Sequence, residues 1–136
     1  MRLTRSIVLI SIALGLAGCG ARSHTAAEHP GATPAVMSAA DAHAYLADHP
    51  EALVLDVREP AEWNDDLGHI EGAKQIPLET LEARLAEIDA WKDKPVIVVC
   101  RSGERSERAV ETLRAAGFKL AVNLEGGMSA WKGAGY

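Results

Sequence analysis

Residues 95–106 of the chain are Pro95-Val96-Ile97-Val98-Val99-Cys100-Arg101-Ser102-Gly103-Glu104-Arg105-Ser106, and this stretch decides the fold. Four aliphatic residues that end in a cysteine favour a buried β-strand stopping at Cys100. The apolar residues of the next segment, 107–117, recur at helical spacing, and Gly117 suits the position just past a helix end. The sequence therefore predicts a strand, a cysteine loop and a helix, which is the repeating unit of a parallel α/β sheet.

The cysteine loop has the chemistry of an anion site. Backbone N–H groups at a helix N-terminus converge on a point where negative charge is favoured. A thiol held there beside Arg101 and Arg105 should ionise more readily than a free one. The alternative is an inert cysteine that merely ends a core strand. Such a residue would not need a loop with two arginines, so we interpret Cys100 as a nucleophile.

The cysteine loop resembles the active-site loop of rhodanese-type sulfurtransferases. Three further blocks resemble the same family in the same order: residues 55–62, residues 68–73 with Ile76-Pro77, and the C-terminal Gly126-Gly127-Met128-Ser129-Ala130-Trp131. Together the blocks cover the chain from about Ser38 to its end. The resemblance implies an α/β fold with a five-stranded, mostly parallel sheet and helices on both faces.

The resemblance also implies roles for individual residues. Cys100 would be catalytic, and the substrate would be bound by Arg58 and by the loop residues Arg101, Ser102, Gly103, Glu104, Arg105 and Ser106. Asp56, at the end of a predicted strand, would give structural support by holding Arg58 or the cysteine loop. Arg58 has a second interpretation, as a surface residue paired with Glu59 or Glu62. His69 could in principle pair with a thiol, but the family places this residue at a loop-to-strand junction, and we interpret it as structural.

The predicted reaction is sulfur transfer through a persulfide on Cys100. A small anionic donor such as thiosulfate would supply the sulfur, and cyanide or a thiol would accept it, with no metal and no organic cofactor. One alternative is a non-enzymatic persulfide carrier or binding module. Another is a cysteine-based phosphatase or arsenate reductase. Those enzymes place five residues between cysteine and arginine, whereas four separate Cys100 from Arg105, so their wider loop fits this sequence less well.

The N-terminus is predicted to be an export signal. A basic start precedes an apolar run, Ile7–Ala17, which is too short to span a bilayer. The run ends in Leu16-Ala17-Gly18-Cys19, which resembles a bacterial lipoprotein signal. We therefore expect a signal peptide at 1–18, a lipidated Cys19 with a flexible tether to residue 35, and a rhodanese domain at 36–136. The alternative is ordinary cleavage that leaves Cys19 as a free thiol. Lipidation would anchor the chain in the cell envelope on the periplasmic side, at the outer membrane if the source is Gram-negative.

Composition limits the partners. With 136 residues, one domain is expected. Without residues 1–18, which contain Arg2 and Arg5 and no acid, 12 basic and 19 acidic residues remain, a net charge of −7. This balance argues against nucleic acid as a partner. We expect a monomer.

Further elements are expected along the domain. A helix should begin after Ser38, whose hydroxyl suits an N-cap with Asp41 three residues on, and end before Pro50. Strands are predicted at 34–37, 52–57, 73–76, 96–99 and 120–124. The apolar residues between 78 and 88 predict an amphipathic α-helix, and Gly126-Gly127 permits a tight turn before a last short helix.

Overall fold

The structure, a computed structural model, describes residues 35–136. The predicted signal peptide, Cys19 and all but the last residue of the predicted tether lie outside these residues. Within them, none of the helices is long and apolar enough to cross a bilayer.

The domain is built on a five-stranded sheet in the order β1-β5-β4-β2-β3, with every neighbouring pair parallel. The predicted α/β fold is therefore confirmed, and the sheet is wholly rather than mostly parallel. The strands are β1 (Val36–Met37), β2 (Leu53–Asp56), β3 (Lys74–Gln75), β4 (Val96–Val99) and β5 (Ala121–Leu124). The α-helices are α1 (Ala39–Asp48), α2 (Leu78–Leu81), α3 (Glu104–Ala115) and α4 (Gly127–Gly133), and the 3₁₀-helices are η1 (Pro60–Glu62) and η2 (Glu82–Trp91).

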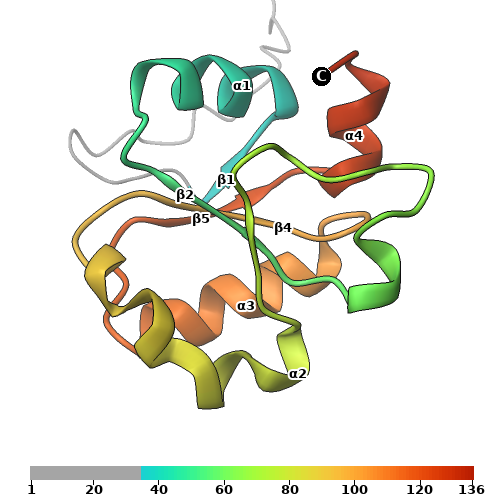
Figure 1. Ribbon diagram of the computed structural model, residues 1–136. Coiled ribbons are helices and arrows are strands. Elements are labelled where there is room, and N and C mark those ends of the chain that lie inside the picture. Colours follow the sequence, from blue (N-terminus) through green and yellow to red (C-terminus); the bar gives the residue numbers. More distant parts are fainter. Residues whose placement is uncertain (1–34) are drawn as a thin grey trace, which may run out of the picture. The chain divides into compact units, whose positions relative to one another are not determined.

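Helices cover both faces of the sheet, with α1 and α4 on one face and α2 and α3 on the other (Figure 1). Each face has its own apolar cluster, because alternate side chains of a strand point to opposite sides. On β4, Val96 and Val98 belong to the cluster under α3, whereas Ile97 and Val99 belong to the cluster under α1 and α4. Cys100 continues this alternation and lies with Val98 on the α3 side.

Two helices differ from the sequence-based prediction. The segment after Pro77 is an α-helix for only one turn and then continues as a ten-residue 3₁₀-helix. Its apolar residues Leu85, Ile88 and Trp91 are three apart, which is the period of a 3₁₀-helix, and all three pack on the core. Helix α3 begins at Glu104 instead of 107, so the loop after Cys100 is shorter than expected.

Candidate active site

Cys100 lies at the carboxyl end of the central strand β4, where the chain turns into α3. Three residues, 101–103, make the connection, and Gly103 is the N-cap of α3 with φ 104°. This left-handed conformation is one that side chains disfavour, and it turns the Gly103 N–H toward the sulfur, at 3.1 Å from Cys100 Sγ. The predicted strand, cysteine and helix thus meet at the sheet edge where parallel α/β proteins bind ligands.

The surroundings of the sulfur favour its charged form. Cys100 is 1% exposed, and burial, the largest single influence, raises the pKa of its thiol. The Ser106 hydroxyl, 3.3 Å from Sγ, and the backbone N–H groups of Ser106, Gly103 and Ser102 act in the other direction. Their combined effect outweighs burial, and the pKa of the Cys100 thiol lies below its usual range. A buried thiolate with several donors is a prepared nucleophile.

The loop residues predicted to bind substrate fall into two groups. Gly103 and Ser106 are buried beside the sulfur, whereas Arg101, Ser102 and Glu104 are exposed. Arg105 is half-buried in the first turn of α3. The structure thus brings Cys100, Gly103 and Ser106 together as an inner shell.

The arginines of the loop are paired with acids from residues 59–68, the segment after β2. Arg105 donates two hydrogen bonds to Glu62, at 2.6 and 2.7 Å. These bonds are the main cause that lowers the pKa of Glu62 to about 2. Arg101 donates to Asp65 at 2.8 Å. A bound anion would therefore compete with carboxylates for both guanidinium groups.

Asp56 and Arg58 form a buried ion pair at the end of β2. Both residues are 0% exposed, and the Arg58 guanidinium donates to both Asp56 carboxylate oxygens, the shortest contact being 2.7 Å. It also donates to the carbonyls of Glu62 and Gly68. The second interpretation of Arg58, as a surface residue paired with Glu59 or Glu62, is wrong, because the arginine is buried and Asp56 supplies its carboxylate partner. In this structure Arg58 faces the 59–68 segment, where it holds the backbone that presents Glu62.

The double glycine Gly126-Gly127 at the start of α4 packs against the backbone of the cysteine loop. A Cβ on Gly127 would lie 2.4 Å from the Cys100 carbonyl oxygen and 2.7 Å from the Arg101 carbonyl, which leaves room only for glycine. The first turn of α4 donates to the same carbonyls, from Met128 N to Cys100 O at 2.8 Å and from Ser129 N to Arg101 O at 3.0 Å. The close approach fixes the direction in which the loop leaves β4.

His69 does not contact the cysteine. Its ring stacks on Trp63 with 4.1 Å between ring centroids, and its Nδ1 lies 3.2 Å from the Trp63 carbonyl oxygen. The contact closes the 59–68 segment on itself, in keeping with a structural role. Among residues 35–136 no group of three or more His, Cys, Asp or Glu side chains is placed to hold a metal ion.

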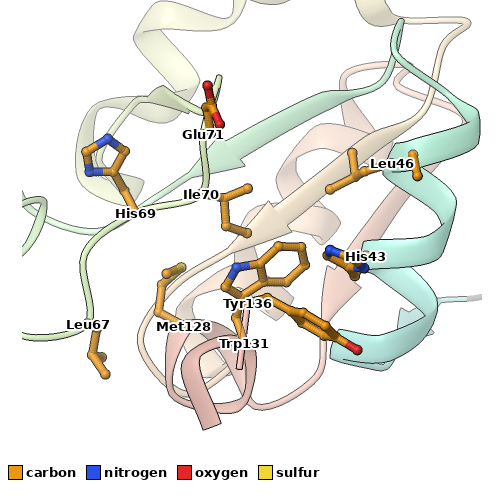
Figure 2. Close-up of a pocket in the computed structure, with 10 residues that line it drawn as sticks. His43, Leu46, Leu67, His69, Ile70, Glu71, Met128, Trp131 and Tyr136 are labelled. Atoms are coloured by element: carbon orange, nitrogen blue, oxygen red, sulfur yellow. The ribbon is translucent and has the colours of Figure 1, made fainter. Parts of the chain in front are cut away.

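A separate hollow of about 490 Å³ lies between α1, α4 and residues 67–71, and Cys100 is not among the residues that line it (Figure 2). Aromatic rings form part of its wall: His43 stacks on Tyr136 with 4.0 Å between centroids, and Trp131 meets Tyr136 edge-on. The residues that line it include no cysteine, and its two histidines, His43 and His69, are stacked on aromatic rings. We therefore assign the chemistry to Cys100.

Sequence reasoning missed three residues of the site. Glu62 and Asp65 pair with the loop arginines, and Asn123 of β5 accepts a hydrogen bond from Ser106 at 2.6 Å. Asn123 left a signal in the sequence, because it is a polar residue inside an otherwise apolar strand. The two acids left none, since only the position of β2 beside β4 brings them to the loop.

Comparison with known proteins agrees with this geometry. The family model described as "Rhodanese-like domain" matches residues 38–134. A "Sulfurtransferase" of Allochromatium vinosum is 41% identical over 86 residues, which cover 63% of this chain and 77% of that protein. A "Putative sulfur carrier protein" of Bacillus subtilis is 39% identical over 87 residues, or 63% of this chain and 45% of that one. The solution structure of a rhodanese-like domain from Anabaena superimposes with a TM-score of 0.66 at 34% identity, covering 75% of this chain and 76% of that one.

Proposed function

The chain belongs to the rhodanese-like domain family, and we propose that it is a sulfurtransferase that carries sulfane sulfur as a persulfide on Cys100. The donor in this proposal is thiosulfate or a similar small anion, and the acceptor is cyanide or a thiol. The observation that carries the proposal is the buried sulfur at the N-terminus of α3, with the Gly103 N–H directed at it and the Ser106 hydroxyl oxygen 3.3 Å away. A relative that is 41% identical over 86 residues is named a sulfurtransferase, which also supports the proposal.

The reaction divides into two displacements. The Cys100 thiolate attacks the outer sulfur of thiosulfate, an S–S bond forms on the enzyme, and the S–S bond of thiosulfate breaks as sulfite leaves with the electron pair. Cyanide then attacks the outer sulfur of the persulfide, which yields thiocyanate and restores the thiolate. The loop N–H groups would hold the negative charge on the outer sulfur in the intermediate. Arg101 and Arg105 would offset the charge of donor and leaving group once an anion displaces their carboxylate partners.

Steady-state kinetics with thiosulfate and cyanide test the proposal. A covalent intermediate predicts ping-pong kinetics, with parallel double-reciprocal lines as the second substrate is varied. The variant Cys100→Ser should have no activity. Arg105→Gln should raise the KM for thiosulfate, and Arg84→Gln is its matched control, because Arg84 is also paired with a glutamate but lies outside the site. Intersecting lines, or an active Cys100→Ser variant, would contradict the mechanism.

A persulfide carrier is the second candidate, and the relative named as a putative sulfur carrier protein favours it. A carrier would accept one sulfur atom on Cys100 and release it only to a particular protein thiol. Rapid loading from thiosulfate with turnover to cyanide or small thiols below one cycle per minute would favour the carrier over the enzyme.

We further propose that the protein acts in the cell envelope, anchored by lipid on Cys19. This proposal rests on the basic start, the short apolar run and the Leu-Ala-Gly-Cys sequence at residues 16–19. Metabolic labelling with a fatty acid should mark the chain, and Cys19→Ser should abolish both the label and detergent-phase partition. Labelling that persists in Cys19→Ser would refute it.

A further inference from the structure

A chain of buried polar groups runs from the nucleophile to the neighbouring strand β5. The Ser106 Oγ lies 3.3 Å from Cys100 Sγ and 2.6 Å from Asn123 Oδ1. Ser106 is 0% exposed and Asn123 is 8% exposed. The sheet register explains the contact, because Asn123 pairs with Val98, two residues before Cys100 and on the same face of β4.

The Ser106 hydroxyl cannot donate a full hydrogen bond to all of its neighbours at once. It has a single hydrogen and three acceptors within reach: Cys100 Sγ, Asn123 Oδ1 and the Gly103 carbonyl oxygen at 3.0 Å. The Gly103 carbonyl oxygen also accepts from the Glu107 N–H of the helix, which uses one of its two lone pairs. Of the other two acceptors, the sulfur and Asn123 Oδ1, the Asn123 contact is the shorter one.

An asparagine differs from other polar residues because its two ends are nearly equal in size and opposite in hydrogen bonding. Its Oδ1 accepts and its Nδ2 donates, so a half-turn of the amide changes the Asn123 contact from acceptor to donor without needing more space. With Oδ1 toward Ser106, the hydroxyl donates to Asn123. With Nδ2 toward Ser106, the hydroxyl oxygen accepts, and its hydrogen is free to point at the sulfur.

We propose that Asn123 is a positioning residue, whose amide directs the Ser106 hydroxyl toward Cys100 when the sulfur is charged and away from it when the sulfur is neutral. This inference rests on the proposed function. The hydrogen-bonded pair of Ser106 and Asn123, called the relay below, has two states in each catalytic cycle. The resting thiolate receives the hydroxyl. In the persulfide the charge moves to the outer sulfur, and the hydroxyl returns to Asn123. No proton leaves Ser106 or Asn123, since only the direction of the hydrogen bonds changes.

The charged groups around the sulfur are separate from this relay. Arg105 on α3 and Arg101 in the loop lie on the outer side of the site, with their partners Glu62 and Asp65 from the segment after β2. The Asp56–Arg58 pair belongs to β2. On β5 the group that meets Ser106 is the uncharged Asn123. A substitution at Asn123 therefore changes the relay and leaves those ion pairs in place.

The test measures the ionisation of Cys100, which does not depend on sulfur transfer. Iodoacetamide alkylation is followed against pH by mass spectrometry of the Cys100 peptide of the full chain. Asn123→Asp can only accept from Ser106, and it adds a negative charge, so the midpoint of its alkylation profile should lie about one pH unit above that of the wild type. Asn123→Leu should raise the midpoint by about half a pH unit. At pH 10 both variants should react like the wild type, because the thiol is then ionised in all of them.

Two comparisons separate positioning from a general disturbance of β5. Val122→Ala removes a buried neighbour of Asn123 and should leave the midpoint of the pH profile unchanged. In a Ser106→Ala background, Asn123→Leu should have no further effect, because the residue through which it acts is missing. An unchanged midpoint in both Asn123 variants, a loss of rate that persists at pH 10, or a full Asn123→Leu effect without Ser106 would each overturn the proposal. Failure of the proposed sulfur transfer would instead leave these profiles as expected.

Discussion

Replacing Gly127 with alanine should destabilise the fold or displace the cysteine loop. The new Cβ would lie 2.4 Å from the Cys100 carbonyl oxygen, where ordinary contact begins near 3.4 Å, so these atoms must separate by about 1 Å. Both neighbours are backbone atoms and cannot turn away as a flexible side chain would. In addition, Gly127 has φ 56°, a conformation that costs other residues about 1–2 kcal/mol.

The strain can be relieved in two ways, and both can be measured. Overpacking of this kind costs about 1–3 kcal/mol, so with the backbone term Gly127→Ala should lose about 2–5 kcal/mol of unfolding free energy. If the cysteine loop moves instead, the displacement of about 1 Å should slow sulfur loading of Cys100 about 100-fold. Urea unfolding followed by tryptophan fluorescence gives the first quantity, and the rate of persulfide formation gives the second.

Gly133→Ala is the matched control. Gly133 ends the same helix, α4, and nothing lies within 4 Å of the place where its Cβ would stand. Alanine at this position should leave the unfolding free energy unchanged or raise it by up to about 1 kcal/mol, the difference in helix propensity between glycine and alanine. The reasoning is refuted if Gly127→Ala matches Gly133→Ala in both stability and loading rate.

Three further substitutions test the ion pairs and the first helix. The Glu62–Arg105 pair should stabilise the fold fully above about pH 4.5 and lose its effect as pH falls toward about 2, where Glu62 becomes protonated in the folded state. The difference in unfolding free energy between wild type and Glu62→Gln should therefore shrink over that range. A difference that does not depend on pH would contradict this. Asp56→Ala should lower the unfolding free energy measured in urea by about 3–5 kcal/mol, because it leaves Arg58 buried without a counter-charge. The double variant Asp56→Ala/Arg58→Met should recover part of this loss. A double variant that is no more stable than Asp56→Ala would argue against the pair. Ser38→Ala removes the N-cap of α1 and should cost about 1 kcal/mol in thermal unfolding, and no change would mean that the cap is dispensable.

Local sequence patterns were enough to predict most of the sheet. The aliphatic run that ends at Cys100 predicts a strand from a few consecutive residues, and β4 occupies the predicted positions 96–99. Ser38 is the N-cap of α1, as its hydroxyl suggested, and accepts from the Asp41 N–H at 3.1 Å. The 3₁₀ character of residues 82–91 was missed, because a three-residue spacing also fits one face of an α-helix.

Contacts between distant segments could not be derived in the same way. Arg105 and Glu62 are 43 positions apart, and Arg101 and Asp65 are 36 apart. Only the strand order, which places β2 beside β4, brings the segment after β2 to the cysteine loop. The position of Arg58 was left open, since the sequence allowed both a contact with Asp56 and a surface pair with Glu59 or Glu62.

The central claim is that Cys100 accepts a sulfur atom, and intact-mass spectrometry tests it most directly. The purified protein is incubated with thiosulfate and compared with Cys100→Ala, which also accounts for any reaction at Cys19. We expect the wild type to gain the mass of one sulfur atom, cyanide to remove it, and Cys100→Ala to gain nothing. A wild-type protein that gains no sulfur while Cys100 remains reduced and open to alkylation would contradict the account.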